Sequence, residues 1–304
     1  MAHGRWRDKT GNHRDFENVS GQQARLARTT TGVQDCALIR QDKAARMTAA
    51  TTEFAPGATR LRAPSLLLTL SEGRGLAEFA AGVAMRPMML TAPRGDGHPV
   101  LVLPGFMASD KSTGFLRKYL TDLGYDARAW GNGRNLGRFY KMRDVLSRQL
   151  RDLHAETGRK VSLVGWSLGG VFSRYLALTH PDIVRSVVTL GSPFAGDINA
   201  TNAKRLYEYM SGEGEPDPGD LERLAGDLPV PNTSIYTRLD GVVNWRTCLP
   251  RPAANAEAIE VHLASHLGIG GNPAALWAVA DRLAQAEGSF TPFVRNGPFA
   301  YAYA

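Results

Sequence analysis

A serine flanked by glycines stands where an apolar run of the chain gives way to a helical pattern. The segment Gly165-Trp166-Ser167-Leu168-Gly169 follows the apolar residues 161–164 and leads into a helix predicted for 168–179. A Gly-x-Ser-x-Gly segment between a strand and a helix is typical of a nucleophile elbow, a strained turn that exposes the serine hydroxyl. Glycine is needed there because a Cβ would collide with neighbouring backbone. We therefore predict that Ser167 is a nucleophile.

A serine nucleophile needs a base that accepts its proton, and in an elbow of this kind the base follows the serine in the chain. Beyond the helix that follows Ser167, the candidates are His262 and His266. His262 falls inside the predicted strand 259–263, whereas His266 lies just past its end, where a parallel sheet presents catalytic groups. We predict His266 as the base and His262 as a structural neighbour.

The base in turn needs a carboxylate that orients it, and Asp240 is the preferred candidate. It ends the predicted strand 235–239, and Gly241 permits a turn toward His266. Asp197, just after the preceding strand, stays open as an alternative. Three other aspartates lie in a polar segment where we expect solvated side chains: Asp217, Asp220 and Asp227.

Acyl chemistry at a serine also needs two backbone N–H groups that stabilise an oxyanion. We expect one from Leu168, directly after Ser167, at the start of a helix whose dipole favours negative charge. The other is expected from Phe106, because Gly105 lets the backbone of this loop approach a substrate. A Pro-Gly pair such as Pro104-Gly105 also ends many ordinary strands, but its place in this sheet favours the oxyanion role.

Short apolar runs alternate with helical patterns through most of the chain, which predicts an α/β fold, a parallel sheet with helices on both faces. Strands are expected at 100–103, 125–130, 161–164, 184–190, 235–239 and 259–263. Helices are expected at 65–85, 111–123, 139–156, 168–179 and 273–286. Residues 194–232 interrupt the alternation, with helices predicted at 199–210 and 221–225. We therefore read 194–232 as an insertion at the carboxyl edge of the sheet.

The first 60 residues of this 304-residue chain are polar and basic and show no sustained period, so we expect a disordered extension before a domain at 61–304. Residues 1–46 hold nine Lys/Arg and five Asp/Glu, which accounts for +4 of the net charge of +7. The domain is thus nearly neutral, and no nucleic-acid-binding motif accompanies the basic residues. The position of Met47 leads to the hypothesis that residues 1–46 are an upstream extension, dispensable for folding and activity.

Cysteine content and hydropathy indicate the cellular compartment in which the protein is expected. The two cysteines, Cys36 and Cys248, cannot build a disulfide framework, so a reducing compartment is acceptable. No apolar stretch reaches the length of a membrane span and no signal-peptide pattern opens the chain, so we expect a cytoplasmic protein. No Cys/His cluster has metal-ligand spacing, and we expect neither a metal nor another cofactor.

Four motifs together give residues 97–287 a resemblance to the α/β-hydrolase superfamily, particularly to bacterial lipase-like esterases. They are the loop Pro104-Gly105-Phe106, the elbow at 165–170, the acid loop at 240–243 and the pair Ser265-His266. Many such lipases have His where this chain has Trp166, and His-Gly where it has Pro104-Gly105, which leaves the acyl preference open. The family's usual first two strands are not evident before Val100, so we expect a reduced sheet of about six strands.

The resemblance implies a serine esterase or lipase that acts on a small-molecule ester, with no nucleic-acid partner and no stable membrane insertion. Ser167 would form an acyl intermediate, His266 would serve as base and then acid, and Asp240 would hold the histidine tautomer. The insertion 194–232 would be a small helical cap, a candidate for contact with a lipid interface. Its apolar side is equally consistent with packing against the domain. Four residues are expected to line the substrate pocket: Trp166, Leu206, Tyr207 and Met210.

Three other functions stay open. An acyltransferase would use the same triad and deliver the acyl group to an alcohol or an amine. Residues 165–170 and 178–181 are also similar to pimeloyl-carrier methyl ester esterases, but seven acidic against three basic residues in 204–227 argue against an acidic carrier. A binding protein on a hydrolase scaffold would usually lack a triad residue, and all three are present. Acyl chain length and oligomeric state are not determined by the sequence.

Overall fold

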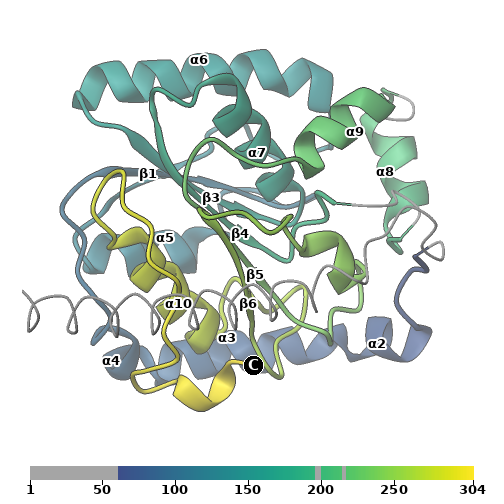
Figure 1. Ribbon diagram of the computed structural model, residues 1–304. Coiled ribbons are helices and arrows are strands. Elements are labelled where there is room, and N and C mark those ends of the chain that lie inside the picture. Colours follow the sequence, from purple (N-terminus) through teal and green to yellow (C-terminus); the bar gives the residue numbers. More distant parts are fainter. Residues whose placement is uncertain (1–60, 196–199, 214–216) are drawn as a thin grey trace, which may run out of the picture. The chain divides into compact units, whose positions relative to one another are not determined.

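The computed structural model describes residues 61–195, 200–213 and 217–304, leaving out the side chains of three residues in helix α8 (Figure 1). The predicted extension 1–60 and the hypothesis about Met47 concern residues outside these ranges and stay predictions. None of the helices in the described ranges has the length and apolar character that a bilayer crossing requires.

Six strands form one sheet in the described part of the chain, and each neighbouring pair is parallel. Their spatial order is β2-β1-β3-β4-β5-β6. The strands are β1 (Pro99–Leu103), β2 (Asp126–Ala129), β3 (Val161–Trp166), β4 (Val184–Leu190), β5 (Asn232–Tyr236) and β6 (Ala256–Glu260). The predicted parallel sheet of about six strands is confirmed. Because all carboxyl ends lie at one edge, the loops that follow the strands meet there.

The sheet separates two hydrophobic cores, because alternate residues of a strand point to opposite faces. In β1, Val100 and Val102 pack into one core, while Leu101 and Leu103 pack into the other. All four are fully buried, as expected for a strand that is covered on both sides. Helices α5 (Gly114–Asp122) and α10 (Pro273–Leu283) cover the first face, and α6 (Phe139–Thr157) and α7 (Leu168–Thr179) cover the second (Figure 1).

The last two strands, β5 and β6, begin and end three residues earlier than predicted. The apolar residues Leu239 and Leu263 favoured the later positions, but they are 37% and 77% exposed in the loops beyond the strands. The residues at 232–234 are polar and yet buried in β5. His262 consequently lies in an exposed turn and not in a strand, so that part of the prediction is wrong. The loops that carry Asp240 and His266 are longer than expected.

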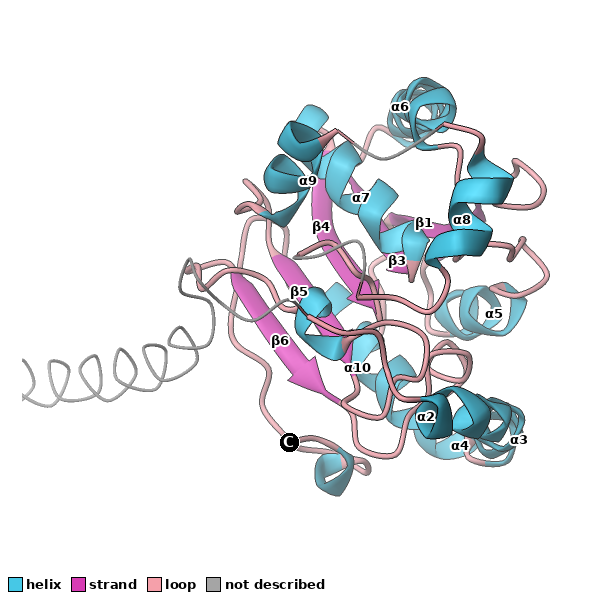
Figure 2. Cartoon of the chain, turned by 90° about the vertical axis from the view of Figure 1, so that its right-hand side faces the viewer, coloured by secondary structure: helices cyan, strands magenta, loops and turns pink. Residues whose placement is uncertain are grey.

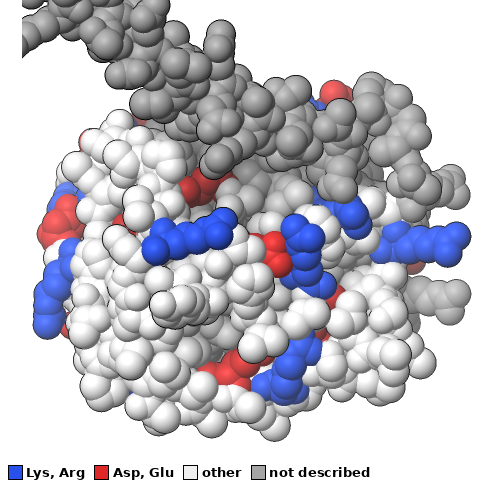
Figure 3. Space-filling view, turned by 60° about the horizontal axis from the view of Figure 1, so that its bottom comes forward, with Lys and Arg blue, Asp and Glu red and all other residues white. Residues whose placement is uncertain are grey.

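Residues 65–85, predicted as one helix, form α2 (Leu66–Leu70), a 3₁₀ turn η1 (Ser71–Arg74) and α3 (Gly75–Ala84), followed by α4 (Arg86–Met89). The α-helix is interrupted where Ser71, Gly73 and Gly75, residues of low helix propensity, lie close together. The outer side of this segment is apolar, with four leucines 71% to 82% exposed: Leu66, Leu67, Leu70 and Leu76. Figure 3 shows that this side of the molecule is largely uncharged, with scattered basic and acidic side chains.

The interruption between β4 and β5 contains α8 (Lys204–Ser211) and α9 (Pro218–Ala225), which lie on either side of α7 in the view of Figure 2. Asp217 caps α9 by accepting hydrogen bonds from the N–H groups of Gly219 and Asp220 at 2.8 and 3.2 Å. Arg174 of α7 donates from its Nε to the Leu224 carbonyl at 2.6 Å, which ties α9 to the helix that follows Ser167.

Candidate active site

The turn from β3 to α7 is strained and leaves room only for glycine on either side of Ser167. Ser167 has a φ of 53°, in the left-handed region that costs a non-glycine residue about 1–3 kcal/mol. A Cβ on Gly165 would collide with the backbone of Gly169 and Gly170, and one on Gly169 would collide with the Leu103 carbonyl. The elbow therefore packs against the end of β1 and holds the Ser167 hydroxyl at the carboxyl edge of the sheet.

Three side chains from three different loops form a continuous hydrogen-bonded chain at this edge. The Oγ of Ser167 lies 2.9 Å from the Nε2 of His266, and the Nδ1 of His266 lies 2.7 Å from the Oδ2 of Asp240. The other carboxylate oxygen of Asp240 accepts from the N–H groups of Val242 and Val243, both at 2.8 Å. With a proton on Nδ1 held by Asp240, Nε2 is free to accept the hydroxyl proton of Ser167.

The electrostatic surroundings of His266 favour its protonated form. Burial lowers the pKa of its imidazole, but the charge and hydrogen bond of Asp240 and the charge of Glu72 raise it more, so the pKa lies above its ordinary value of 6.5. The side chains of His266 and Asp240 are only 4% and 2% exposed, so water screens this interaction little. The imidazole is thus suited to take a proton from a hydroxyl.

None of the described alternatives for base and acid takes part in this hydrogen-bonded chain, and one alternative lies outside the described residues. His262 is exposed, two residues past the end of β6. Asp197 falls outside the described residues. Asp217 and Asp227 are exposed in the interruption between β4 and β5, and Asp220 lies at the cavity described below.

The loop after β1 approaches Ser167 closely. A Cβ on Gly105 would lie 3.1 Å from the Cβ of Ser167, and the next residue but one, Met107, has a φ of 62°. The buried Asn135 holds this loop, donating from its Nδ2 to the Pro104 carbonyl at 2.9 Å and accepting from the Met107 N–H at 2.7 Å. Asn135 was missed at the sequence level, because one asparagine in a Gly/Asn loop carries no signal of its buried partners.

A cavity of about 220 Å³ opens beside Ser167 and His266, with a mainly apolar and aromatic lining. Tyr207 lines it as predicted, and its ring lies 5.7 Å from that of Phe106 in an edge-to-face contact. Five lining residues that sequence reasoning did not single out come from α6, α7 and the cap region: Phe139, Tyr140, Val171, Phe194 and Leu224. They carry no local signal, because the same apolar residues are expected in any buried helix face.

The other predicted pocket residues are placed differently. Trp166 does not line this cavity, because its indole packs under Gly270 and donates from Nε1 to the His266 carbonyl at 3.0 Å. It supports the base loop from behind. Met210 is half-buried on α8 but is not part of the lining. The side chain of Leu206 lies outside the described residues.

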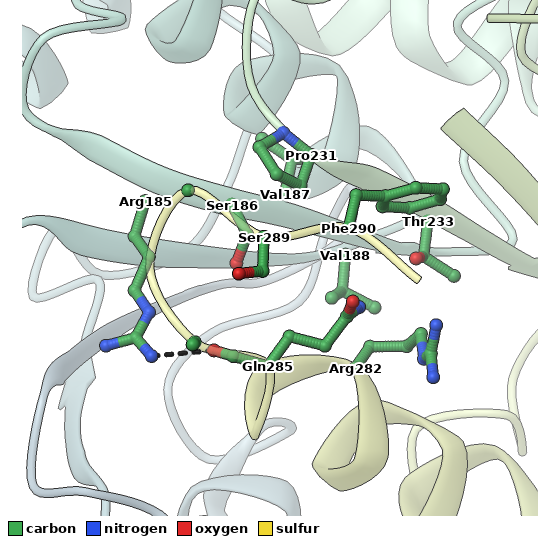
Figure 4. Close-up of a pocket in the computed structure, with 12 residues that line it drawn as sticks. Arg185, Ser186, Val187, Val188, Pro231, Thr233, Arg282, Gln285, Ser289 and Phe290 are labelled. Atoms are coloured by element: carbon green, nitrogen blue, oxygen red, sulfur yellow. Dashed lines mark hydrogen bonds between the residues drawn. The ribbon is translucent and has the colours of Figure 1, made fainter. Parts of the chain in front are cut away.

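A second hollow lies near the amino ends of β4 and β5, away from Ser167 (Figure 4). It holds only about 10 Å³, and Arg185 closes one side by donating from Nη2 to the Gln285 carbonyl at 2.7 Å. This volume is about that of one water molecule, so the hollow has no room for a substrate.

Comparisons with known proteins point to one fold family. A family described as "alpha/beta hydrolase fold" matches residues 99–221. The serine hydrolase BPHL of Mus musculus is 31% identical over 167 residues, which are 47% of this chain and 56% of the mouse protein. A triacylglycerol lipase of Burkholderia plantarii is 28% identical over 43% of this chain and 38% of its own length. The chain thus spans about half or less of the length of these relatives.

Among solved structures, lipase B of Aspergillus fumigatus aligns with a TM-score of 0.52 over 63% of this chain and 53% of its own. At 15% sequence identity this likeness bears on the fold alone. It agrees with the parallel sheet, the strained serine turn after β3 and the match over 99–221. Residues 99–221 are therefore similar to the alpha/beta hydrolase fold family, and the likeness to the solved structure concerns the same fold.

Proposed function

We propose that this protein is a serine hydrolase of carboxylic esters, an esterase or lipase. The observation that carries the proposal is the hydrogen-bonded chain from Ser167 through His266 to Asp240, beside an apolar cavity. The relatives named serine hydrolase and triacylglycerol lipase support the same class of reaction. The buried His266–Asp240 contact gives the serine a base of raised pKa, which an ordinary surface serine does not have.

In this proposal the Ser167 Oγ attacks the ester carbonyl while its proton passes to the Nε2 of His266. The carbonyl oxygen becomes an oxyanion that accepts hydrogen bonds from the N–H groups of Phe106 and Leu168. The protonated His266 then gives its proton to the departing alcohol, which leaves an acyl-serine. Water attacks this ester in the same way, with His266 again as base, and the acid is released.

The geometry around the oxyanion loop supports the assignment of its N–H donors. The N–H groups of Met107 and Ala108 donate to the carbonyls of Asn135 and Gly105 and are thereby occupied. Phe106 lies between Gly105 and Met107 and lines the cavity together with Leu168 and Ser167. This placement beside Ser167 supports the proposal that the N–H groups of Phe106 and Leu168 are the two oxyanion donors.

The cavity lining favours an ester with an apolar acyl group. Phe139, Val171, Phe194 and Leu224 offer no charge to a substrate, and Tyr207 presents an aromatic ring at the same wall. Burial of a methylene group in such a lining contributes about 0.8 kcal/mol. A contact of the cap with a lipid interface stays a prediction of the sequence.

A covalent probe tests the proposed nucleophile without a chosen substrate. An alkyl fluorophosphonate should react at Ser167, whose Oγ bonds to phosphorus while fluoride leaves and the proton passes through His266. Mass spectrometry of the digested protein should place one adduct on the peptide that contains Ser167. The Ser167→Ala variant should stay unlabelled, and Ser289→Ala, a substitution of an exposed serine, should be labelled like the wild type. An adduct on another residue, or none in folded protein, would contradict the proposal.

A further inference from the structure

Backbone N–H groups from two separate loops converge on the side chain of Glu72, in the 3₁₀ turn η1. Its Oε1 accepts from the N–H groups of Gly241 at 2.7 Å and His266 at 3.1 Å, and its Oε2 accepts from Leu267 at 2.8 Å. Glu72 is only 5% exposed. Three N–H donors therefore satisfy a buried carboxylate, an arrangement in which charge-assisted hydrogen bonds are strong.

The three donors belong to the loops that carry the proposed acid and base. Gly241 directly follows Asp240, and the N–H of His266 belongs to the base itself. One oxygen of Glu72 is shared between these two donors. The carboxylate thus links the backbone of the acid loop to that of the base loop, at the residues whose side chains meet at 2.7 Å.

Other residues of the same segment hold the same two loops. The Nη2 of Arg74 donates to the Leu239 carbonyl at 2.6 Å and to the Ala264 carbonyl at 2.9 Å. The Oγ1 of Thr69 donates to the Gly241 carbonyl at 2.8 Å. The approach is close, because a Cβ on Gly241 would collide with the backbone of Leu68. The segment from α2 to η1 therefore holds both loops in place through hydrogen bonds.

We propose that Glu72 is a positioning residue of the active site, whose carboxylate sets the spacing between Asp240 and His266. This inference rests on the proposed function, since it assigns Glu72 a part in the same reaction. Glu72 does not line the substrate cavity. Its effect is exerted through the two loops, so it acts on the chemical step and not on substrate binding.

The charge of Glu72 distinguishes this role from simple packing. Two carboxylates, Asp240 and Glu72, raise the pKa of the His266 imidazole against the effect of burial. Two further charged groups contact these loops: the Arg74 guanidinium, which is bound to carbonyl groups of both, and the buried Glu78 carboxyl group, which accepts from the Ser265 N–H at 2.8 Å. Neutralising Glu72 should therefore displace the loops and also lower the pKa of His266. A residue that served only to stabilise the fold would not change that pKa.

The decisive variant is Glu72→Gln, because it keeps the size of the side chain and removes the charge. Its amide nitrogen would face a backbone N–H, donor against donor. We expect kcat for an ester substrate to fall about 10- to 100-fold, the cost of a small misplacement of catalytic groups, with KM unchanged. The matched control is Glu287→Gln, the same change at an exposed site, which should keep wild-type values.

The pKa of His266 can be measured without any substrate, by NMR titration of its imidazole Cε1–H, assigned with a His266→Asn variant. We expect a lower pKa in Glu72→Gln than in the wild type. An unchanged pKa in folded Glu72→Gln would overturn the inference whatever its activity. An absence of ester hydrolysis in the wild type would instead contradict the proposed function, and the titration would still decide the role of Glu72.

If Glu72→Gln does not fold, Glu72→Asp decides, because it keeps the charge and withdraws the oxygens by one methylene. A reduced kcat at unchanged KM, with the wild-type pKa of His266, would support the positioning role. Wild-type kcat in folded Glu72→Asp would overturn it.

Discussion

The elbow and the acid–base pair hold their catalytic groups in different ways. Around Ser167, consecutive residues and their own backbone define the geometry, because glycine is required on both sides of the serine. Asp240 and His266 sit instead on long loops, and the Glu72 side chain that binds them lies 169 to 195 positions away in the chain. Local backbone strain fixes the nucleophile, and long-range polar contacts fix its partners.

The difference affects how each region should respond to mutation. In the elbow a substitution disturbs packing between β1, β3 and α7, so stability should suffer first. In the two loops a substitution can leave the sheet intact and move one catalytic group relative to another. Activity should then fall in a protein that remains folded.

Removal of the base gives the largest effect expected in the loops. His266→Ala should lower kcat about 10⁶-fold, as loss of a triad base does in other serine hydrolases. Fold and thermal stability should change little by comparison, because the loop backbone keeps its bonds to Glu72. Single-turnover kinetics with an activated ester measures this. The control is His262→Ala, a change at the exposed histidine of the same loop, which should keep wild-type kinetics.

Asp240→Asn should lower kcat by about 10⁴-fold. The N–H groups of Val242 and Val243 both point at Oδ1 of Asp240, so they would select the amide oxygen at that position. The amide nitrogen would then face the Nδ1 of His266 and force its proton onto Nε2, where it cannot accept from Ser167. A variant within tenfold of wild-type kcat would show that Asp240 does not set the tautomer.

In the elbow, Gly169→Ala tests whether close backbone packing around Ser167 contributes to stability. Its Cβ would collide with the carbonyl of Leu103, and overpacking of this kind costs about 1–3 kcal/mol or more in free energy of unfolding. Urea denaturation measures the loss. Gly114→Ala is the matched control, because a Cβ there meets nothing within 4 Å. Equal stability of the two variants would refute the account of the elbow.

The smallest expected effect concerns pH. His266 must be neutral to act as a base, and its pKa is raised above 6.5 by Asp240 and Glu72. As the pH is lowered, His266 becomes protonated and kcat/KM should fall. As the pH is raised through an apparent pKa above 6.5, His266 loses this proton and kcat/KM should rise. A pH profile between pH 5 and pH 9 measures this, and a half-maximal point below 6.5 would contradict it.

The elbow and the two loops also differ in how well the sequence predicts them. Ser167 could be found from five adjacent residues, since the strand, turn and helix around it are local. Asp240 and His266 could be found although β5 and β6 end earlier than expected, because their order in the chain and their place beyond the strands were sufficient.

Glu72 and Asn135 could not be found from the sequence. Each is one polar residue whose partners are backbone groups of distant loops, and no periodicity or spacing marks such contacts. Trp166 was assigned to the pocket because of its place in the elbow, but its indole packs behind the base loop. The fold class was predictable for a simpler reason: buried parallel strands are short apolar runs, and the sequence alternates them with helices.

The most direct test of the central claim compares wild type with Ser167→Ala in the hydrolysis of p-nitrophenyl esters from acetate to palmitate. We expect wild-type turnover with an optimum set by the apolar cavity, and a loss of about 10⁶-fold in the variant at every chain length. Equal turnover in the two proteins, or none in folded wild type at any chain length, would contradict ester hydrolysis by Ser167.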